Sequence, residues 1–71
     1  MKLKDDDKNF LRLIQRSPDI GEGWRNVSPK LWQLVEMHQK TIPTLFEAEL
    51  EPTGGGRVRL TDEAVTVLKW L

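Results

Sequence analysis

Alternation of apolar and charged residues from Phe46 to Leu60 constrains the fold more than any other pattern in the chain. Before a Gly-rich break, apolar residues alternate with glutamates, and after it apolar residues alternate with Arg57 and Arg59. Such alternation is typical of strands that have one buried and one exposed face, and a Gly-rich stretch between two strands is typical of a loop. The segment therefore predicts a two-stranded antiparallel hairpin with a charged outer face.

Opposite charges are expected to face each other across this hairpin. Glu49 and Glu51 on the first strand share the outer face with Arg57 and Arg59 on the second. Cross-strand pairs of opposite charge contribute about 0.2–1 kcal/mol each, and less when they are exposed. We expect the pairs to favour the hairpin and its register, and to neutralise part of the charge on the two arginines.

The segment that leads into the hairpin, Thr41–Leu45, has room for little more than one helical turn, which Pro43 could open. The alternative is a longer helix over residues 42–50, because the residue types there tolerate helical structure. The strict alternation and Pro52 favour a short turn followed by a strand.

Two amphipathic helices are predicted before the hairpin. The first runs from about Asp6 to Arg16, and the three consecutive aspartates at its start cap and solubilise it. A metal site is the alternative role for these aspartates. It is disfavoured because consecutive helical residues point in different directions and no further ligand residue follows them. The second helix has Ser28 as its N-cap and Pro29 at its first position, and we expect it to end at Gln39 or Lys40.

A glycine-containing loop, Asp19–Val27, connects these two helices, and a short strand near Trp24–Val27 is an open alternative. Gly21 and Gly23 allow unusual backbone angles there. The pair lacks the third glycine, the Lys-Ser/Thr step and the preceding apolar strand of a phosphate-binding loop. We therefore expect a structural loop.

A last helix is predicted from Thr61, whose hydroxyl is placed to cap it, to the final residues. Its apolar stripe includes Ala64 and Leu68, and the chain ends in Trp70 and Leu71. Two roles stay open for these terminal residues. They either close the core against the first helix, which is the simpler expectation for Trp70, or form a contact surface for a protein partner or a second copy.

Composition limits the possible functions. A chain of 71 residues forms one domain, here residues 1–71, and its formal net charge of zero argues mildly against a dedicated nucleic-acid binder. The lack of cysteine excludes disulfides and cysteine-based zinc sites and favours a cytoplasmic protein. No apolar run approaches the roughly 20 residues that span a bilayer, and the N-terminal acids do not fit a signal peptide. We expect no membrane partner.

The single histidine, His38, is the only candidate for acid–base or metal chemistry. Its nearest acid, Glu36, lies two residues away and cannot share its helix face. No paired carboxylates, ligand cluster or nucleophile with an adjacent base stands out. The sequence therefore predicts a structural histidine and a protein that is not an enzyme and has no cofactor or metal.

The order of predicted elements is helix, loop or short strand, helix, short helical turn, strand, strand, helix. This is an α+β domain, and the order resembles the winged helix family. The closest local likeness is Gly56–Ala64, GRVRLTDEA, which is similar to the last wing strand and following helix of winged helix-turn-helix regulators. The resemblance implies a three-helix core backed by a two-stranded wing. It also implies frequent DNA binding in a regulatory role, with protein contact as a second use.

The wing of that family would correspond to Pro52–Arg59, with Arg57 and Arg59 as candidates for phosphate contacts. The recognition helix normally precedes the wing, but here that place holds the short Thr41–Leu45 segment, which has no basic residue and is followed by glutamates. The expected DNA-binding side chains are therefore on the second helix and the wing: Lys30, Gln33, Lys40, Arg57 and Arg59. The alternative function is a protein-interaction or assembly adaptor that uses the acidic strand and the apolar C-terminal helix with Trp70 and Leu71.

Overall fold

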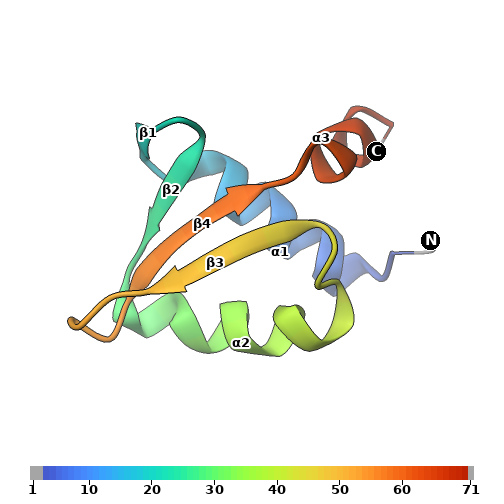
Figure 1. Ribbon diagram of the computed structural model, residues 1–71. Helices are drawn as coiled ribbons and strands as arrows, with labels where there is room; N and C mark the ends of the chain where they lie inside the picture. The colour runs from blue at the N-terminus through green and yellow to red at the C-terminus, as the bar shows by residue number, and fades with distance from the viewer. Residues whose placement is uncertain (1–2, 71) are drawn as a thin grey trace.

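Three α-helices and a four-stranded antiparallel sheet form an α+β domain (Figure 1). The structure, a computed structural model, describes residues 3–70. The elements in chain order are α1 (Asp5–Arg16), β1 (Asp19–Gly21), β2 (Trp24–Val27), the 3-10 helix η1 (Pro29–Leu31), α2 (Trp32–Thr41), β3 (Phe46–Leu50), β4 (Gly56–Leu60) and α3 (Asp62–Lys69).

The sheet has the strand order β1-β2-β4-β3, so the last strand in sequence lies in its interior. The predicted β3–β4 hairpin is confirmed, with Phe46 opposite Leu60 and Leu50 opposite Gly56. The short strand that the sequence left open near Trp24–Val27 is confirmed as β2, which pairs with β4. Strand β1, which pairs with β2, was not predicted. The β1–β2 turn contains Glu22 at a φ of 54°, a left-handed conformation that glycine adopts readily and glutamate seldom does.

The helix boundaries agree closely with the sequence patterns. α1 starts one residue earlier than predicted, and the Lys4 backbone N–H donates to the Asp7 carboxylate at 3.3 Å. The Thr61 hydroxyl caps α3 by accepting from the Ala64 N–H at 3.4 Å. At the second helix the side chain of Ser28 makes no capping hydrogen bond, and its carbonyl instead accepts from the Leu31 N–H, which closes the 3-10 turn η1.

A single turn leads into the hairpin, as expected. The Leu45 N–H donates to the Ile42 carbonyl at 3.2 Å, and the side chains of Ile42 and Leu45 are both buried. Strand β3 begins at the next residue. The choice of turn and strand over a helix across residues 42–50 is therefore confirmed.

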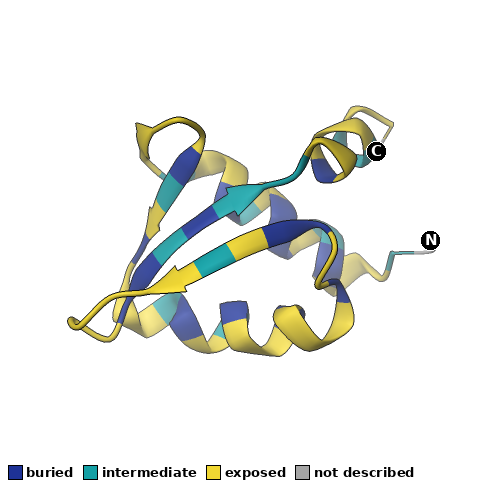
Figure 2. Cartoon of the chain, viewed as in Figure 1, coloured by how far each residue is buried: buried dark blue, intermediate teal, exposed yellow. Residues whose placement is uncertain are grey.

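The hydrophobic core lies between the inner face of the sheet and the helices α1 and α2, which lie on the same side of it (Figures 1 and 2). Val58 of β4 and Leu11 of α1 are fully buried there. Within residues 3–70, no helix combines the length and apolar character that crossing a bilayer requires.

The expectation that Trp70 closes the core is wrong, because its exposed fraction is 85%. α3 contributes Ala64 and part of Leu68 to the core. At 100° per residue, Trp70 lies about 120° around the helix axis from Ala64, so its indole points away from the buried stripe. Leu71, the other predicted partner residue, lies outside the described residues.

Candidate functional site

The outer face of the sheet carries a ladder of paired charges. The Arg57 guanidinium donates to Glu49 Oε2 through Nε at 2.9 Å and Nη2 at 2.6 Å, and Arg59 Nη2 donates to Glu47 Oε2 at 2.5 Å. The β3–β4 register places each arginine directly opposite its glutamate. The expected partner Glu51 lies beyond the end of β3, so Glu47 takes its place in the ladder.

Trp24 of β2 lies beneath the two arginines of this ladder. The guanidinium carbons of Arg57 and Arg59 lie 4.4 and 4.7 Å from the centre of its ring. Both arginines therefore combine a cation–π contact with an ion pair. The indole is nearly buried, with an exposed fraction of 9%, although it faces away from the main core.

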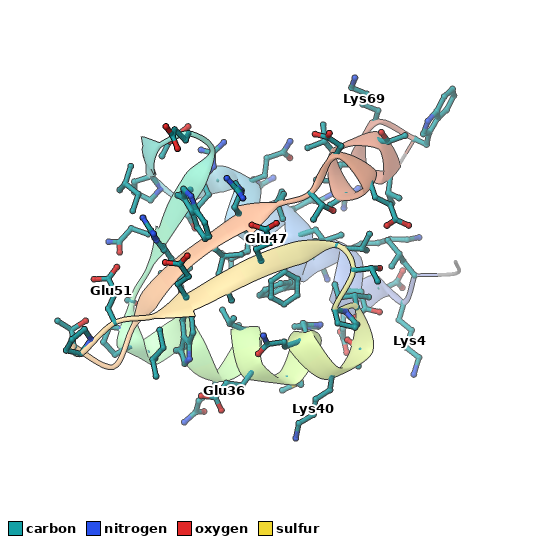
Figure 3. All side chains as sticks on the ribbon, in the orientation of Figure 1. Lys4, Glu36, Lys40, Glu47, Glu51 and Lys69 are labelled. Atoms are coloured by element: carbon teal, nitrogen blue, oxygen red, sulfur yellow. The ribbon has the colours of Figure 1, made fainter. Side chains whose placement is uncertain are left out.

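The five predicted DNA-binding residues do not converge on one face. Arg57 and Arg59 alternate with the buried Val58, so they point away from the side of the sheet that α1 and α2 cover. Lys30, Gln33 and Lys40 are exposed on η1 and α2, in the helical layer. Figure 3 shows Lys40 directed away from the sheet.

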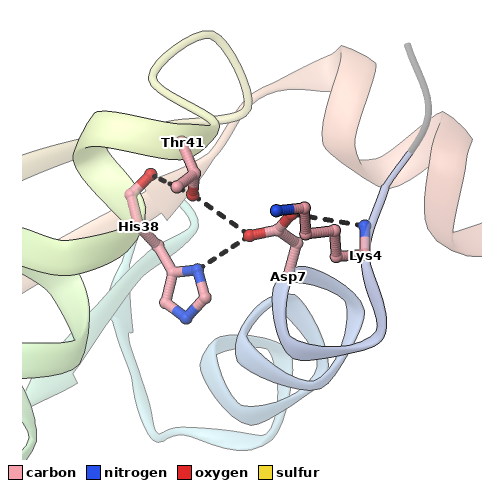
Figure 4. Close-up of polar contacts among 4 residues, drawn as sticks. All are labelled: Lys4, Asp7, His38 and Thr41. Carbon is pink, nitrogen blue, oxygen red and sulfur yellow. Dashed lines mark hydrogen bonds and ion pairs between the residues drawn. The ribbon is translucent and has the colours of Figure 1, made fainter.

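A buried polar cluster joins α1 to α2 (Figure 4). His38 Nδ1 lies 2.9 Å from Asp7 Oδ1, and the Thr41 hydroxyl donates to the same oxygen at 3.1 Å. The side chains of His38 and Asp7 are only 7% and 9% exposed. Phe10 stacks on the imidazole, with ring centres 4.5 Å apart.

The prediction of a buried, structural His38 is consistent with this cluster, but the inference that it has no acid partner is wrong. That inference considered only Glu36, whereas the partner comes from 31 positions earlier in the chain. A local signal was present, because Asp7 precedes Phe10, Leu11 and Ile14 by three, four and seven residues, which places it on the buried face of α1.

Asp7 is held in its ionised form by its surroundings. Burial raises the pKa of its carboxyl, but the hydrogen bonds from His38, Thr41 and the Lys4 backbone, together with the charge of His38, lower it by more. The net pKa lies below its ordinary value of 3.8. The cluster is therefore a carboxylate that accepts three hydrogen bonds in a nearly dry site.

His38 also contributes to the wall of an open groove between α1 and α2. The other lining side chains are mainly apolar, with two polar ones from α1: Asp6, Asn9, Phe10, Leu13, Leu34 and Met37. None of these offers a hydroxyl, thiol or amine that the imidazole could activate as a nucleophile. Among residues 3–70, no group of three or more His, Cys, Asp or Glu side chains is arranged to hold a metal ion.

Comparison with known proteins adds no relative to this picture. The chain matches no protein-family model, no curated protein and no solved structure.

Proposed function

We propose that the chain is a small non-enzymatic module, winged-helix-like in architecture, that works by contacting other proteins. The observation that carries the proposal is Trp70, which is 85% exposed at the C-terminal end of α3. Tryptophan is strongly enriched among the residues that dominate binding energies at protein interfaces. An exposed indole at the end of α3 therefore supports a contact surface there.

The winged-helix part of the proposal is supported by the β3–β4 hairpin and the capped helix that follows it. It departs from the family pattern where a recognition helix would precede the wing, because residues 42–45 form only a turn there. This departure favours the protein-contact use of such a fold over the DNA-binding use.

The arginines of the hairpin also favour protein contact. Arg57 and Arg59 already donate to carboxylates of the same chain and stack on Trp24. A DNA phosphate would have to displace Glu49 and Glu47, and the freed carboxylates would then repel it. The wing is thus poorly suited to phosphate binding.

Self-association is the first test of the α3 surface, because the chain itself is the available partner. We expect sedimentation equilibrium to detect a dimer, and we expect Trp70→Ala to weaken its affinity at least about tenfold. Truncating a tryptophan at an interface commonly costs about 2 kcal/mol of binding free energy. Met37→Ala is the matched control, because Met37 is 56% exposed on α2. A chain that stays monomeric at all accessible concentrations, or that loses its dimer equally with Met37→Ala, would argue against this surface.

DNA binding is retained as a second candidate, restricted to the helical layer. It is favoured by Lys30 and Lys40, which form no ion pair within residues 3–70. If duplex DNA binds there, Lys30→Ala/Lys40→Ala should lower the slope of log affinity against log salt by about two, whereas Arg57→Ala should leave it unchanged. Fluorescence anisotropy with a labelled duplex measures both, and no binding at low salt would remove this candidate.

A further inference from the structure

Strand β3 forms an open edge of the sheet. It pairs with β4 on one side, and the strand order within residues 3–70 places no strand on its other side. The opposite edge, β1, is only three residues long and has an irregular register with β2. Short, irregular edges resist further pairing, whereas a regular edge of five residues is a template for another strand.

The backbone of β3 directs alternate hydrogen-bonding groups to this open edge. The Glu51 N–H donates to the Gly55 carbonyl at 2.8 Å, and the Thr61 N–H donates to the Leu45 carbonyl at 3.1 Å. These bonds continue the β3–β4 register, so odd-numbered residues direct their peptide groups toward β4. The N–H and C=O groups of Phe46, Ala48 and Leu50 therefore point to the open edge.

The side chains beside this edge are patterned by face. Glu47 and Glu49 lie on the outer face with side chains 52% exposed, and the exposed Glu51 follows two positions later. The inner face carries Ala48, which is half-buried, and Leu50, which is 65% exposed. The edge thus presents acidic groups on one face and an uncovered apolar side chain on the other.

The ion-pair ladder leaves capacity on the glutamates. Arg57 and Arg59 bind only the Oε2 atoms of Glu49 and Glu47, and no hydrogen bond from the described residues reaches either Oε1. A carboxylate has about four acceptor sites on its two oxygens. Each glutamate can therefore accept a second cation from a strand on its other side.

We propose that the open edge of β3 binds an extended peptide segment of a partner protein in which Lys or Arg alternates with apolar residues. The peptide adds a fifth strand to the sheet, with its basic side chains beside Glu47, Glu49 and Glu51 and its apolar side chains beside Ala48 and Leu50. This inference rests on the proposed protein-binding function and names the chemistry of one partner. A second copy fits poorly, because pairing β3 with β3 sets glutamates opposite glutamates, which is destabilising.

Three labelled peptides of about eight residues, a normal strand length, test the proposal by fluorescence anisotropy. One alternates Lys with Val, one has the same composition with all lysines before all valines, and one alternates Glu with Val. We expect the alternating Lys peptide to bind at least about tenfold more tightly than either control, because only it matches both faces of the strand. Equal binding of the block peptide, or no binding of the alternating peptide, would overturn the proposal.

Amide exchange measured by NMR locates the bound peptide. The N–H groups of Ala48 and Leu50 should become protected on binding, and Glu49→Gln should weaken binding while leaving the circular dichroism spectrum unchanged. Protection confined to α2 or α3 would contradict the assigned edge.

The variant Trp70→Ala should still bind the peptide. Loss of self-association and loss of peptide binding are therefore separate results, which distinguish the α3 surface from the β3 edge.

Discussion

Replacing Asp7 with alanine is expected to lower the free energy of unfolding by about 3 kcal/mol, because the change removes one partner from a buried polar cluster. The His38 ring nitrogen, the Thr41 hydroxyl and the Lys4 N–H would all lose their acceptor. Urea denaturation followed by circular dichroism measures the loss. For a domain this small, 3 kcal/mol is about half of a typical total stability.

Two further variants separate the role of the cluster from the role of helix capping. Asp6→Ala removes an exposed carboxylate from the same first turn and should cost no more than about 1 kcal/mol. Asp7→Asn keeps an acceptor oxygen but removes the charge, and should cost about 1–2 kcal/mol. Similar losses for Asp6→Ala and Asp7→Ala would show that Asp7 acts only through the helix end.

The pH dependence of stability gives an independent readout of the same carboxylate. Because the pKa of Asp7 is lower in the folded chain than its ordinary value of 3.8, its stabilising contribution is fully present above that value. The contribution is lost as the pH falls from about 4 through the lower folded pKa. The difference in stability between the native chain and Asp7→Asn should therefore shrink below about pH 4, and a constant difference down to pH 2 or so would contradict the assignment.

Gly56→Ala should destabilise the chain by about 3 kcal/mol, at the upper end of the usual cost of overpacking. A methyl group on Gly56 would lie against the Glu49 carbonyl and within 2.7 and 2.8 Å of two carbons of the Trp32 ring. The first β4 residue therefore has no room for a side chain between the neighbouring strand and the core. Thermal unfolding followed by circular dichroism measures the effect.

A double-mutant cycle tests the steric origin of this loss. Trp32→Leu removes the ring but leaves the Glu49 carbonyl in place, so Gly56→Ala should cost less in the Trp32→Leu background but still destabilise it. Thr53→Ala, in the exposed part of the same hairpin loop, should be nearly neutral. Equal costs of Gly56→Ala in both backgrounds would exclude a contribution from the tryptophan ring.

Local patterns in the sequence predict much of this fold. The alternation before and after the Gly-rich loop specifies the β3–β4 hairpin and its charged face, because a period of two cannot bury a helix stripe. The N-terminal caps of α1 and α3 also involve only neighbouring residues, so short stretches of sequence are enough to predict where these helices begin. Strand β1 was missed because it has only three residues and its turn to β2 uses a non-glycine residue at positive φ.

Features that depend on tertiary contacts could not be derived in the same way. Asp7 and His38 belong to different helices, and only the packing of α1 against α2 brings them together. The separation of Lys40 from Arg57 onto different layers likewise follows from the placement of α2 beneath the sheet. Core closure was the simpler expectation for Trp70 because it is an apolar residue at the end of a helix, but the helical phase directs it away from the buried stripe.

The interior position of β4 also bears on how the chain folds during synthesis. β2 is synthesised roughly 30 residues before its partner β4, at about 5–20 residues per second, so for a second or more β1 is its only available partner strand. The β3–β4 hairpin closes over a short loop and can form within microseconds once both strands are available. Docking of β2 onto that preformed hairpin closes a longer loop than the hairpin does and therefore costs more loop-closure entropy.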